Sequence, residues 1–198
     1  MQDTAANGAE LARAIKQRGA ELGFQQVGIS DVDLSNAEEQ LAQWLARGFH
    51  GDMHYMHKHG KRRSRPAELL PGTIRVISAR MDYLPESQST SRALLDHGAQ
   101  AYISRYALGR DYHKVLRGRL KRLARYIEEI IGPLGHRVFV DSAPVLEKPL
   151  AEKAGIGWLG KHTNVINKDA GSWFFLGELY TDLPLPVDEA AGDHCGTC

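Results

Sequence analysis

The sequence has little cysteine and no long apolar run. Its two cysteines, Cys195 and Cys198, both lie at the C-terminal end of the 198 residues, so they cannot cross-link distant parts of a fold. No apolar stretch reaches the roughly 18 residues of a membrane span. The segment Met1–Glu10 is polar and has no apolar core of a secretory signal. We therefore expect a cytoplasmic protein that has no membrane partner and is held together by burial.

The composition, 42% hydrophobic and 25% charged, is that of an ordinary globular chain. The net charge of +1 hides an uneven distribution, because Arg105–Arg125 carries eight basic residues against one acid, Asp111. Tyrosines lie in and beside this basic stretch. Such a pattern is typical of a surface that contacts nucleic-acid phosphates, and a solvated helix face is the alternative.

Apolar periodicity and turn residues predict a mixture of helices and strands. Helices are expected before Gly23, over Ser35–Gly48 with Ser35 and Glu38 as a capping box, over Asp111–Ile131 and over Val145–Ala154. Strands are expected over Phe24–Ser30, Arg75–Tyr83, Ala101–Tyr106 and Arg137–Asp141, with a loop over Leu84–His97. A hairpin is expected to pair Thr163–Asn167 with Trp173–Thr181. These elements predict an α+β fold, a layered mixed or antiparallel sheet flanked by helices.

The glycines of Gly155–Lys161 match the spacing of dinucleotide-binding and phosphate-binding loops. Both motifs need a strand before the glycines and a helix after them. Here a helix is expected before the glycines and a strand-like segment after them. We therefore expect the glycines to allow close backbone approach rather than to bind a nucleotide.

Four histidines, His50, His54, His57 and His59, fall within ten residues. Zinc binding is the specific interpretation of this cluster. Asp52 is the one acid among them, however, and the surrounding run is basic. Because positive charge disfavours a dication, the sequence favours a solvated loop.

Asp141 follows the apolar run Val138–Val140 and precedes a Ser-Ala-Pro turn. A carboxyl group beside apolar residues can hold a proton and donate it, whereas a turn or cap aspartate is the alternative. Cys195 and Cys198 have the C-x-x-C spacing of redox dithiols, half zinc sites and iron–sulfur sites. Two thiolates cannot complete a four-ligand site, so we expect no metal bound by them alone.

Six blocks follow one another in order along the chain. They are Ser104–His113, Val140–Lys148, Ala154–Lys161, Gly171–Gly177, Thr181–Leu185 and Cys195–Cys198. Together these blocks closely resemble epoxyqueuosine reductases. The resemblance implies a cobalamin-dependent, iron–sulfur oxidoreductase that reduces epoxyqueuosine to queuosine at the tRNA wobble position, the last step of queuosine biosynthesis. It also implies a fold similar to nitroreductase-like cobalamin-binding domains.

The resemblance assigns roles to individual residues. Asp141 is implied as the proton donor, and Cys195 and Cys198 as ligands of [4Fe–4S] clusters. The implied cobalamin contacts are Arg65, Ser104, Tyr106, Asp141, Lys161, Asn164 and Val165.

The resemblance also implies a domain division and partners. Residues 1–184 are expected to form the cobalamin-binding catalytic domain, and residues 185–198 a linker and the start of a truncated ferredoxin-like domain. The expected partners are tRNA carrying epoxyqueuosine and an electron donor, and the chain is expected to be a monomer. The alternative is a non-catalytic corrinoid- or flavin-binding module of nitroreductase-like fold.

Overall fold

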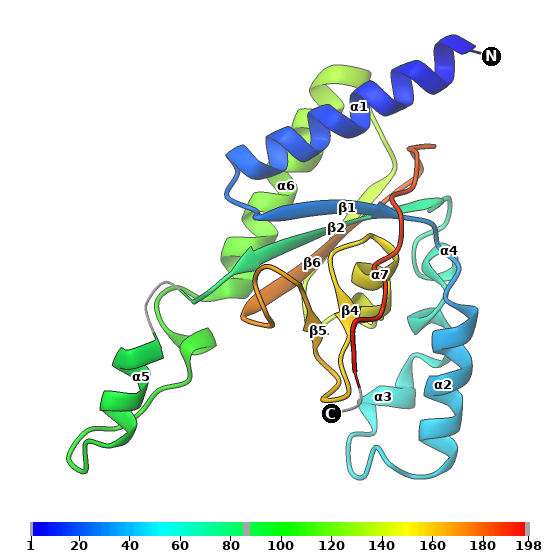
Figure 1. Cartoon of the computed structure of the whole chain (residues 1–198). Coiled ribbons are helices and arrows are strands. Elements are labelled where there is room, and N and C mark those ends of the chain that lie inside the picture. The colour runs from blue at the N-terminus through cyan, green and yellow to red at the C-terminus, as the bar shows by residue number, and fades with distance from the viewer. Residues whose placement is uncertain (1, 85–87, 197–198) are drawn as a thin grey trace.

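A four-stranded sheet lies at the centre of the structure, a computed structural model that describes residues 2–84 and 88–196 (Figure 1). Its strands are β1 (Gln26–Ser30), β2 (Arg75–Asp82), β6 (Phe174–Thr181) and β3 (His136–Phe139), in that spatial order. Every neighbouring pair is antiparallel. The predicted α+β fold with an antiparallel sheet flanked by helices is confirmed.

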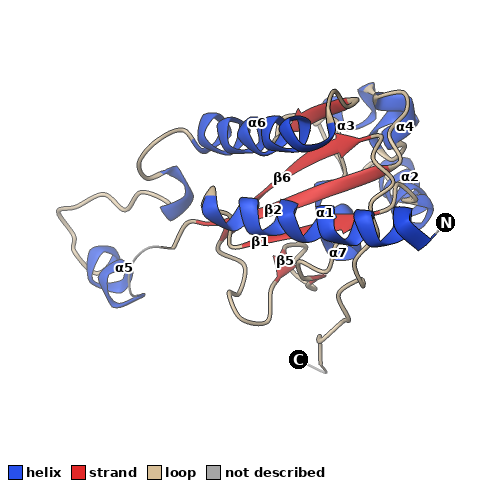
Figure 2. Cartoon of the chain, turned by 90° about the horizontal axis from the view of Figure 1, so that it is seen from above, coloured by secondary structure: helices blue, strands red, loops and turns tan. Residues whose placement is uncertain are grey.

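Two helices, α1 (Gln2–Glu21) and α6 (Tyr112–Ile131), cover one face of the sheet (Figure 2). Leu116, Leu120 and Leu123 recur along α6 at steps of four and three and are fully buried, as the apolar periodicity predicted. Ile130, near the C-terminal end of the helix, is 50% exposed. The basic residues of α6 lie mostly on its outer surface.

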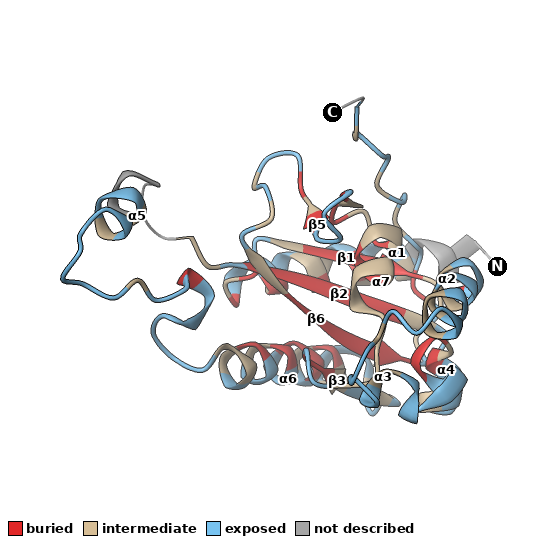
Figure 3. Cartoon of the chain, turned by 90° about the horizontal axis from the view of Figure 1, so that it is seen from below, coloured by how far each residue is buried: buried red, intermediate tan, exposed pale blue. Residues whose placement is uncertain are grey.

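The other face is covered by α7 (Glu147–Lys153) and by a two-stranded sheet of β4 (Trp158–Leu159) and β5 (Val165–Ile166) (Figure 3). The predicted hairpin between Thr163–Asn167 and Trp173–Thr181 is wrong. β5 pairs with β4, because a tight turn closes them through the Gly160 N–H, which donates to the Asn164 carbonyl at 2.9 Å. Both edges of β6 are already occupied by β2 and β3.

Four short helical segments follow β1 and lie outside the sheet. They are α2 (Ser35–Ala46), α3 (Tyr55–Lys58), the 3-10 helix η1 (Gly60–Arg63) and α4 (Pro66–Leu69). The predicted capping box is wrong, because the Glu38 carboxylate binds Ser64 and Arg65 instead of the helix backbone. The Asp33 carboxylate accepts from the Ser35 N–H at 3.0 Å in its place. No residue of α2 is fully buried, so α2 is a peripheral helix.

The segment between β2 and α6 differs from its prediction. A helix, α5 (Gln88–Leu95), stands where a loop was expected, and the 3-10 helix η2 (Arg105–Ala107) stands where a strand was expected. This segment projects away from the sheet (Figure 1), so a strand here would have no edge to pair with. The Arg105 guanidinium instead donates to the Ser91 hydroxyl of α5 at 2.6 and 2.9 Å.

The segment after β6 is attached to the sheet domain. Leu185 is 1% exposed and joins the core under α1 and α6. The Asp188 carboxylate accepts from the Ile29 N–H at 2.8 Å and pairs with Lys16. The domain division at residue 185 stays a prediction. Within the described ranges, no helix is long and apolar enough to cross a bilayer.

Candidate active site

A pocket of about 210 Å³ opens between the start of α6, the end of β3, α7 and β6. Its lining mixes carboxyl groups, an amine and aromatic rings. The lining residues are Tyr83, Tyr112, Asp141, Glu147, Lys148, Asn164, Val165, Ser172, Phe174, Phe175 and Leu176.

Asp141 lies at the mouth of this pocket, two residues after β3 ends. Its backbone has a φ of 48°, a left-handed conformation that aspartate tolerates better than most residues. The Tyr112 hydroxyl donates to Asp141 Oδ2, and His113 Nε2 lies 3.0 Å from the same oxygen. The side chain is 50% exposed. Asp141 is therefore held by two polar partners at a solvent-accessible position, not in the apolar setting that the sequence suggested.

The first turn of α6 positions His113. Asp111 caps the helix, because its Oδ1 accepts from the His113 N–H at 3.0 Å. The same oxygen lies 3.0 Å from His113 Nδ1, and this contact lowers the pKa of Asp111. One ring nitrogen of His113 thus faces Asp111 and the other faces Asp141. This arrangement can relay a proton between solvent and Asp141.

Tyr112 forms an aromatic wall of the pocket. Its ring stacks on Phe175 with centroids 4.0 Å apart and planes 3° from parallel. Burial and the hydrogen bond to Asp141 raise the pKa of Tyr112, so its hydroxyl keeps its proton and acts as a donor.

Glu147, the first residue of α7, is a partly buried acid of the pocket. Burial, followed by the negative charge of Asp141, raises the pKa of Glu147 to about 7. Glu178 lies deeper, on β6, and is fully buried. Neither of its carboxylate oxygens has a hydrogen-bond partner among the described residues. Burial, followed by the charge of Glu147, raises the pKa of Glu178 well above its usual range.

Neither glutamate was among the site residues predicted from the sequence. The available signal was Glu178 itself, an acid in the otherwise apolar run Phe174–Tyr180. An acid inside a central strand has to be buried, and buried acids with a shifted pKa concentrate at functional sites.

The structure brings together four of the seven implied cobalamin contacts. Asp141, Asn164 and Val165 line the pocket. Tyr106 lines an adjoining hollow of about 670 Å³, and its ring centroid lies 6.4 Å from that of Tyr112.

Arg65, Ser104 and Lys161 do not line the Asp141 pocket. The Arg65 guanidinium donates to Glu38 and Glu68, with each ion-pair distance 2.9 Å. Ser104 is exposed at the start of η2. Lys161 Nζ donates to the Gly196 carbonyl at 2.9 Å.

The two cysteines are described only in part. Cys195 is half-buried, and its N–H donates to the Asp193 carboxylate at 2.7 Å. Cys198 lies outside the described residues.

The glycine motif has the packing role that its context predicted. Gly155 follows α7 and Gly157 precedes β4, so a short strand and not a helix follows the glycines. A Cβ atom at Gly157 would lie 2.3 Å from the Ile166 carbonyl oxygen. The glycine is therefore needed for close backbone contact.

Comparisons with known proteins confirm the resemblance seen in the sequence blocks. A family model described as epoxyqueuosine reductase QueG, DUF1730, matches residues 63–142. Curated epoxyqueuosine reductases from Pseudomonas aeruginosa and Escherichia coli are 61% and 57% identical to this chain over 96% of its length. These matches cover 53% and 50% of the two relatives. The chain therefore spans about half the length of the curated relatives it matches.

Solved structures share the fold. The epoxyqueuosine reductase from Streptococcus thermophilus is 28% identical with a TM-score of 0.81, over 94% of this chain and 50% of that chain. An epoxyqueuosine reductase crystallised with an epoxyqueuosine-modified tRNA-Tyr stem loop is 22% identical with a TM-score of 0.82, over 96% and 50% of the two chains. A B12-dependent reductive dehalogenase is more distant, with a TM-score of 0.56 and 16% identity over 95% and 21% of the two chains.

Proposed function

We propose that this chain, which is similar over 96% of its length to the N-terminal half of epoxyqueuosine reductases, binds cobalamin and the substrate base of such an enzyme. The reaction is the reduction of epoxyqueuosine in tRNA to queuosine. The observation that carries the proposal is this similarity together with an acid, Asp141, at the mouth of a pocket lined by further acids and aromatic rings.

The reaction fixes what the site has to provide. Removal of the epoxide oxygen as water, with formation of the alkene, takes two electrons and two protons. Bound cobalamin would supply the reducing electrons. The protein has to hold the base, exclude competing reactions and deliver protons to the leaving oxygen.

Asp141 is the proposed proton donor. Tyr112 and His113 hold its carboxyl group from the side of α6, and His113 can return a proton from solvent because its side chain is 35% exposed. Glu147 lines the same pocket, and its pKa is raised to about 7, so it keeps its proton to a higher pH than an ordinary glutamate does. Glu147 is therefore the second acid from which a proton can reach the substrate.

The residues at the pocket fit a large, planar and partly apolar cofactor. The Asp141 pocket and the adjoining hollow share three aromatic residues, Tyr83, Tyr112 and Phe175. Tyr106 and Leu108 in that hollow are 52% and 46% exposed. Such apolar surface favours a ligand that covers it. Tyr106, Asn164 and Val165 would contact cobalamin there, and contacts from Arg65, Ser104 and Lys161 would lie at the periphery.

We propose that Cys195 and Cys198 supply two ligands of a [4Fe–4S] cluster. Two thiolates are half of a four-ligand set, so the remaining ligands would come from outside this chain. In this view residues 1–184 are the catalytic domain and residues 185–198 lead into a ferredoxin-like domain. A separate electron donor would reduce the clusters, and the enzyme would act as a cytoplasmic monomer.

The first experiment tests the binding of the cofactor and the role of Asp141. Purified chain is mixed with cob(II)alamin or with flavin mononucleotide, and the absorption of the retained cofactor is measured. With cobalamin, a strong chemical reductant and an epoxyqueuosine stem loop, Asp141→Asn should keep the cofactor and lower turnover by about 10²- to 10⁴-fold. Asp169→Asn, at an exposed turn, is the matched control and should be unchanged.

The outcomes separate the alternatives. Retention of flavin alone would favour a non-catalytic flavin-binding module. Unchanged turnover in Asp141→Asn would remove this residue from the mechanism, and the same assay on Glu147→Gln would then test the second acid.

The outer surface of α6 is the proposed tRNA contact. Its exposed basic residues are Lys114, Arg117, Lys121, Arg122 and Arg125. Reversal of Lys121 and Arg125 to glutamate should weaken binding of the stem loop and reduce its salt dependence by about one slope unit per lost phosphate contact. Reversal of two exposed basic residues elsewhere, Arg13 and Lys168, is the control. Equal salt slopes for both double variants would assign the α6 surface to solvent.

A further inference from the structure

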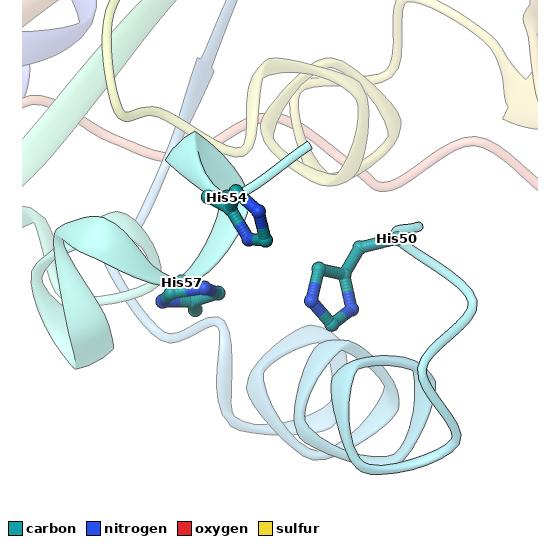
Figure 4. Close-up of side chains that lie close together, drawn as sticks. All are labelled: His50, His54 and His57. Atoms are coloured by element: carbon teal, nitrogen blue, oxygen red, sulfur yellow. The ribbon is translucent and has the colours of Figure 1, made fainter. Parts of the chain in front are cut away.

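Three histidines of the segment between α2 and η1 point toward one another. His50, His54 and His57 place one ring nitrogen each within 4.8 Å of the others (Figure 4). Among the described residues, no other group of three His, Cys, Asp or Glu side chains brings its ligand atoms this close together. His59, the fourth histidine of the sequence cluster, is not part of it.

The backbone brings these side chains together through two successive turns. Gly48 and Gly51 have φ values of 68° and 50°, which glycine adopts without strain. The Met53 N–H donates to the His50 carbonyl at 2.9 Å, and this turn leads directly to His54 at the start of α3. His57 follows three residues later, so it lies on the same side of the helical turn as His54.

His50 is the least exposed of the three histidines. His50 Nδ1 is buried and has no hydrogen-bond partner among the described residues. The His50 ring centroid lies 5.5 Å from that of His57 and 5.9 Å from that of Trp44. These ring contacts hold His50 beside the other two histidines.

In the sequence, the basic residues near the histidines argued against a metal site. In the structure, several of these basic side chains have partners of their own. Lys61 and Arg65 pair with the Glu38 carboxylate at 3.7 and 2.9 Å. The Arg63 guanidinium donates to the Tyr55 carbonyl at 3.0 Å. The other basic side chains of the segment are exposed, so solvent and salt screen their charges.

We propose that His50, His54 and His57 bind one Zn²⁺ ion, with water in the fourth position. Imidazole suits zinc and the neighbouring late first-row divalent metals, and three histidines with one open position form a known tetrahedral arrangement. With zinc–nitrogen bonds of about 2.0 Å, the ligand nitrogens would lie about 3.3 Å apart. The ligand nitrogens now lie within 4.8 Å of one another. Because His54 and His57 are exposed, rotation of their side chains can bring the nitrogens to the shorter spacing. The ion would fasten the turn after α2 to α3.

The experiment measures metal binding in a chain without thiols. Cys195→Ser/Cys198→Ser serves as the background, because the cysteines could also bind zinc. Titration with Zn²⁺ by calorimetry and with Co²⁺ by visible absorption should give one ion per chain. Adding His54→Ala or His57→Ala should weaken the affinity at least tenfold. His59→Ala, in the same segment but outside the group, should leave the affinity unchanged.

Circular dichroism of each variant checks that the fold is kept, which is expected because His54 and His57 are exposed. No ion bound by the thiol-free chain would overturn the proposal. So would equal affinities for the His57→Ala and His59→Ala variants. The result is independent of cobalamin and tRNA binding, because neither ligand is present.

Discussion

The two faces of the central sheet differ in whether polar groups are buried among their apolar residues. Under α1 and α6, the side-by-side residues Ile29, Ile77 and Leu179 are all 0% exposed and belong to one apolar cluster. Under α7, the neighbouring row places Ser78 beside Glu178, both also 0% exposed. Because side chains alternate along a strand, the step from Leu179 to Glu178 leads from the aliphatic face to a face where an acid is buried beside the apolar residues Leu176 and Tyr180.

The difference separates a face that stabilises the fold from a face that carries buried polar groups without partners. Burial of the aliphatic row stabilises the fold. On the α7 face, the Ser78 hydroxyl and the Glu178 carboxylate have no hydrogen-bond partner among the described residues, which costs stability. The pocket with Asp141 and Glu147 lies between this face and α7. A protein retains such a cost where function needs the groups.

The largest effect on the free energy of unfolding is expected from substitution of a glycine, and each face of the sheet offers one for comparison. A Cβ at Gly28, on the α7 face, would lie 2.0 Å from the Ala154 backbone oxygen. A Cβ at Gly177, on the α6 face, would lie 2.8 Å from the end of the flexible Leu116 side chain. Gly28→Ala should therefore lower the free energy of unfolding by more than about 3 kcal/mol, and Gly177→Ala by about 1 kcal/mol. Urea unfolding measures both, and equal losses would mean that α7 shifts as easily as a side chain.

The second largest effect is expected at Glu147, which lines the pocket on the α7 face and makes the free energy of unfolding depend on pH. The folded-state pKa of Glu147 is raised from 4.5 to about 7, so the unfolded chain loses this proton first as the pH rises. The free energy of unfolding should consequently fall between about pH 4.5 and pH 7, by an amount on the order of 2 kcal/mol. Glu147→Gln should reduce this fall, whereas Glu129→Gln, exposed on α6, should not. Unfolding curves at pH 5 and pH 8 that change equally in the two variants would contradict the assignment.

The sequence predicted best those elements that local pattern determines. The spacing of Leu116, Leu120 and Leu123 predicted α6, and its cap Asp111 precedes the helix directly. The pairing of β5 and the place of Glu38 were wrong, because both depend on partners distant in the sequence. β6 pairs with β2 and β3 and leaves no edge for β5. The Glu38 carboxylate pairs with Arg65.

The site residues, too, could be predicted only where the local sequence pattern determines them. Asp141 could be singled out because it follows an apolar strand. Tyr112 and Glu147 could not, since their role comes from packing against Asp141 across 29 residues in one case and from burial in the other. The histidine cluster was visible in the sequence, but a count of charges does not show that Lys61 and Arg65 face Glu38.

The smallest effect on the free energy of unfolding is expected at the N-termini of two helices, α6 and α2. α6, on the apolar face, is capped by the Asp111 side chain, whereas α2 begins without a side-chain cap from its N-cap residue. α2 is held instead from α7, because Lys153 Nζ donates to the Asp33 carbonyl. Asp111→Ala should therefore cost about 1 kcal/mol in the free energy of unfolding, and Ser35→Ala less than about 0.5 kcal/mol, as for an ordinary surface change. Urea unfolding of the two variants measures the difference. A cost for Ser35→Ala as large as that for Asp111→Ala would show that Ser35 caps α2 in solution, and the contrast between a locally encoded helix start and one held by tertiary contacts would then be lost.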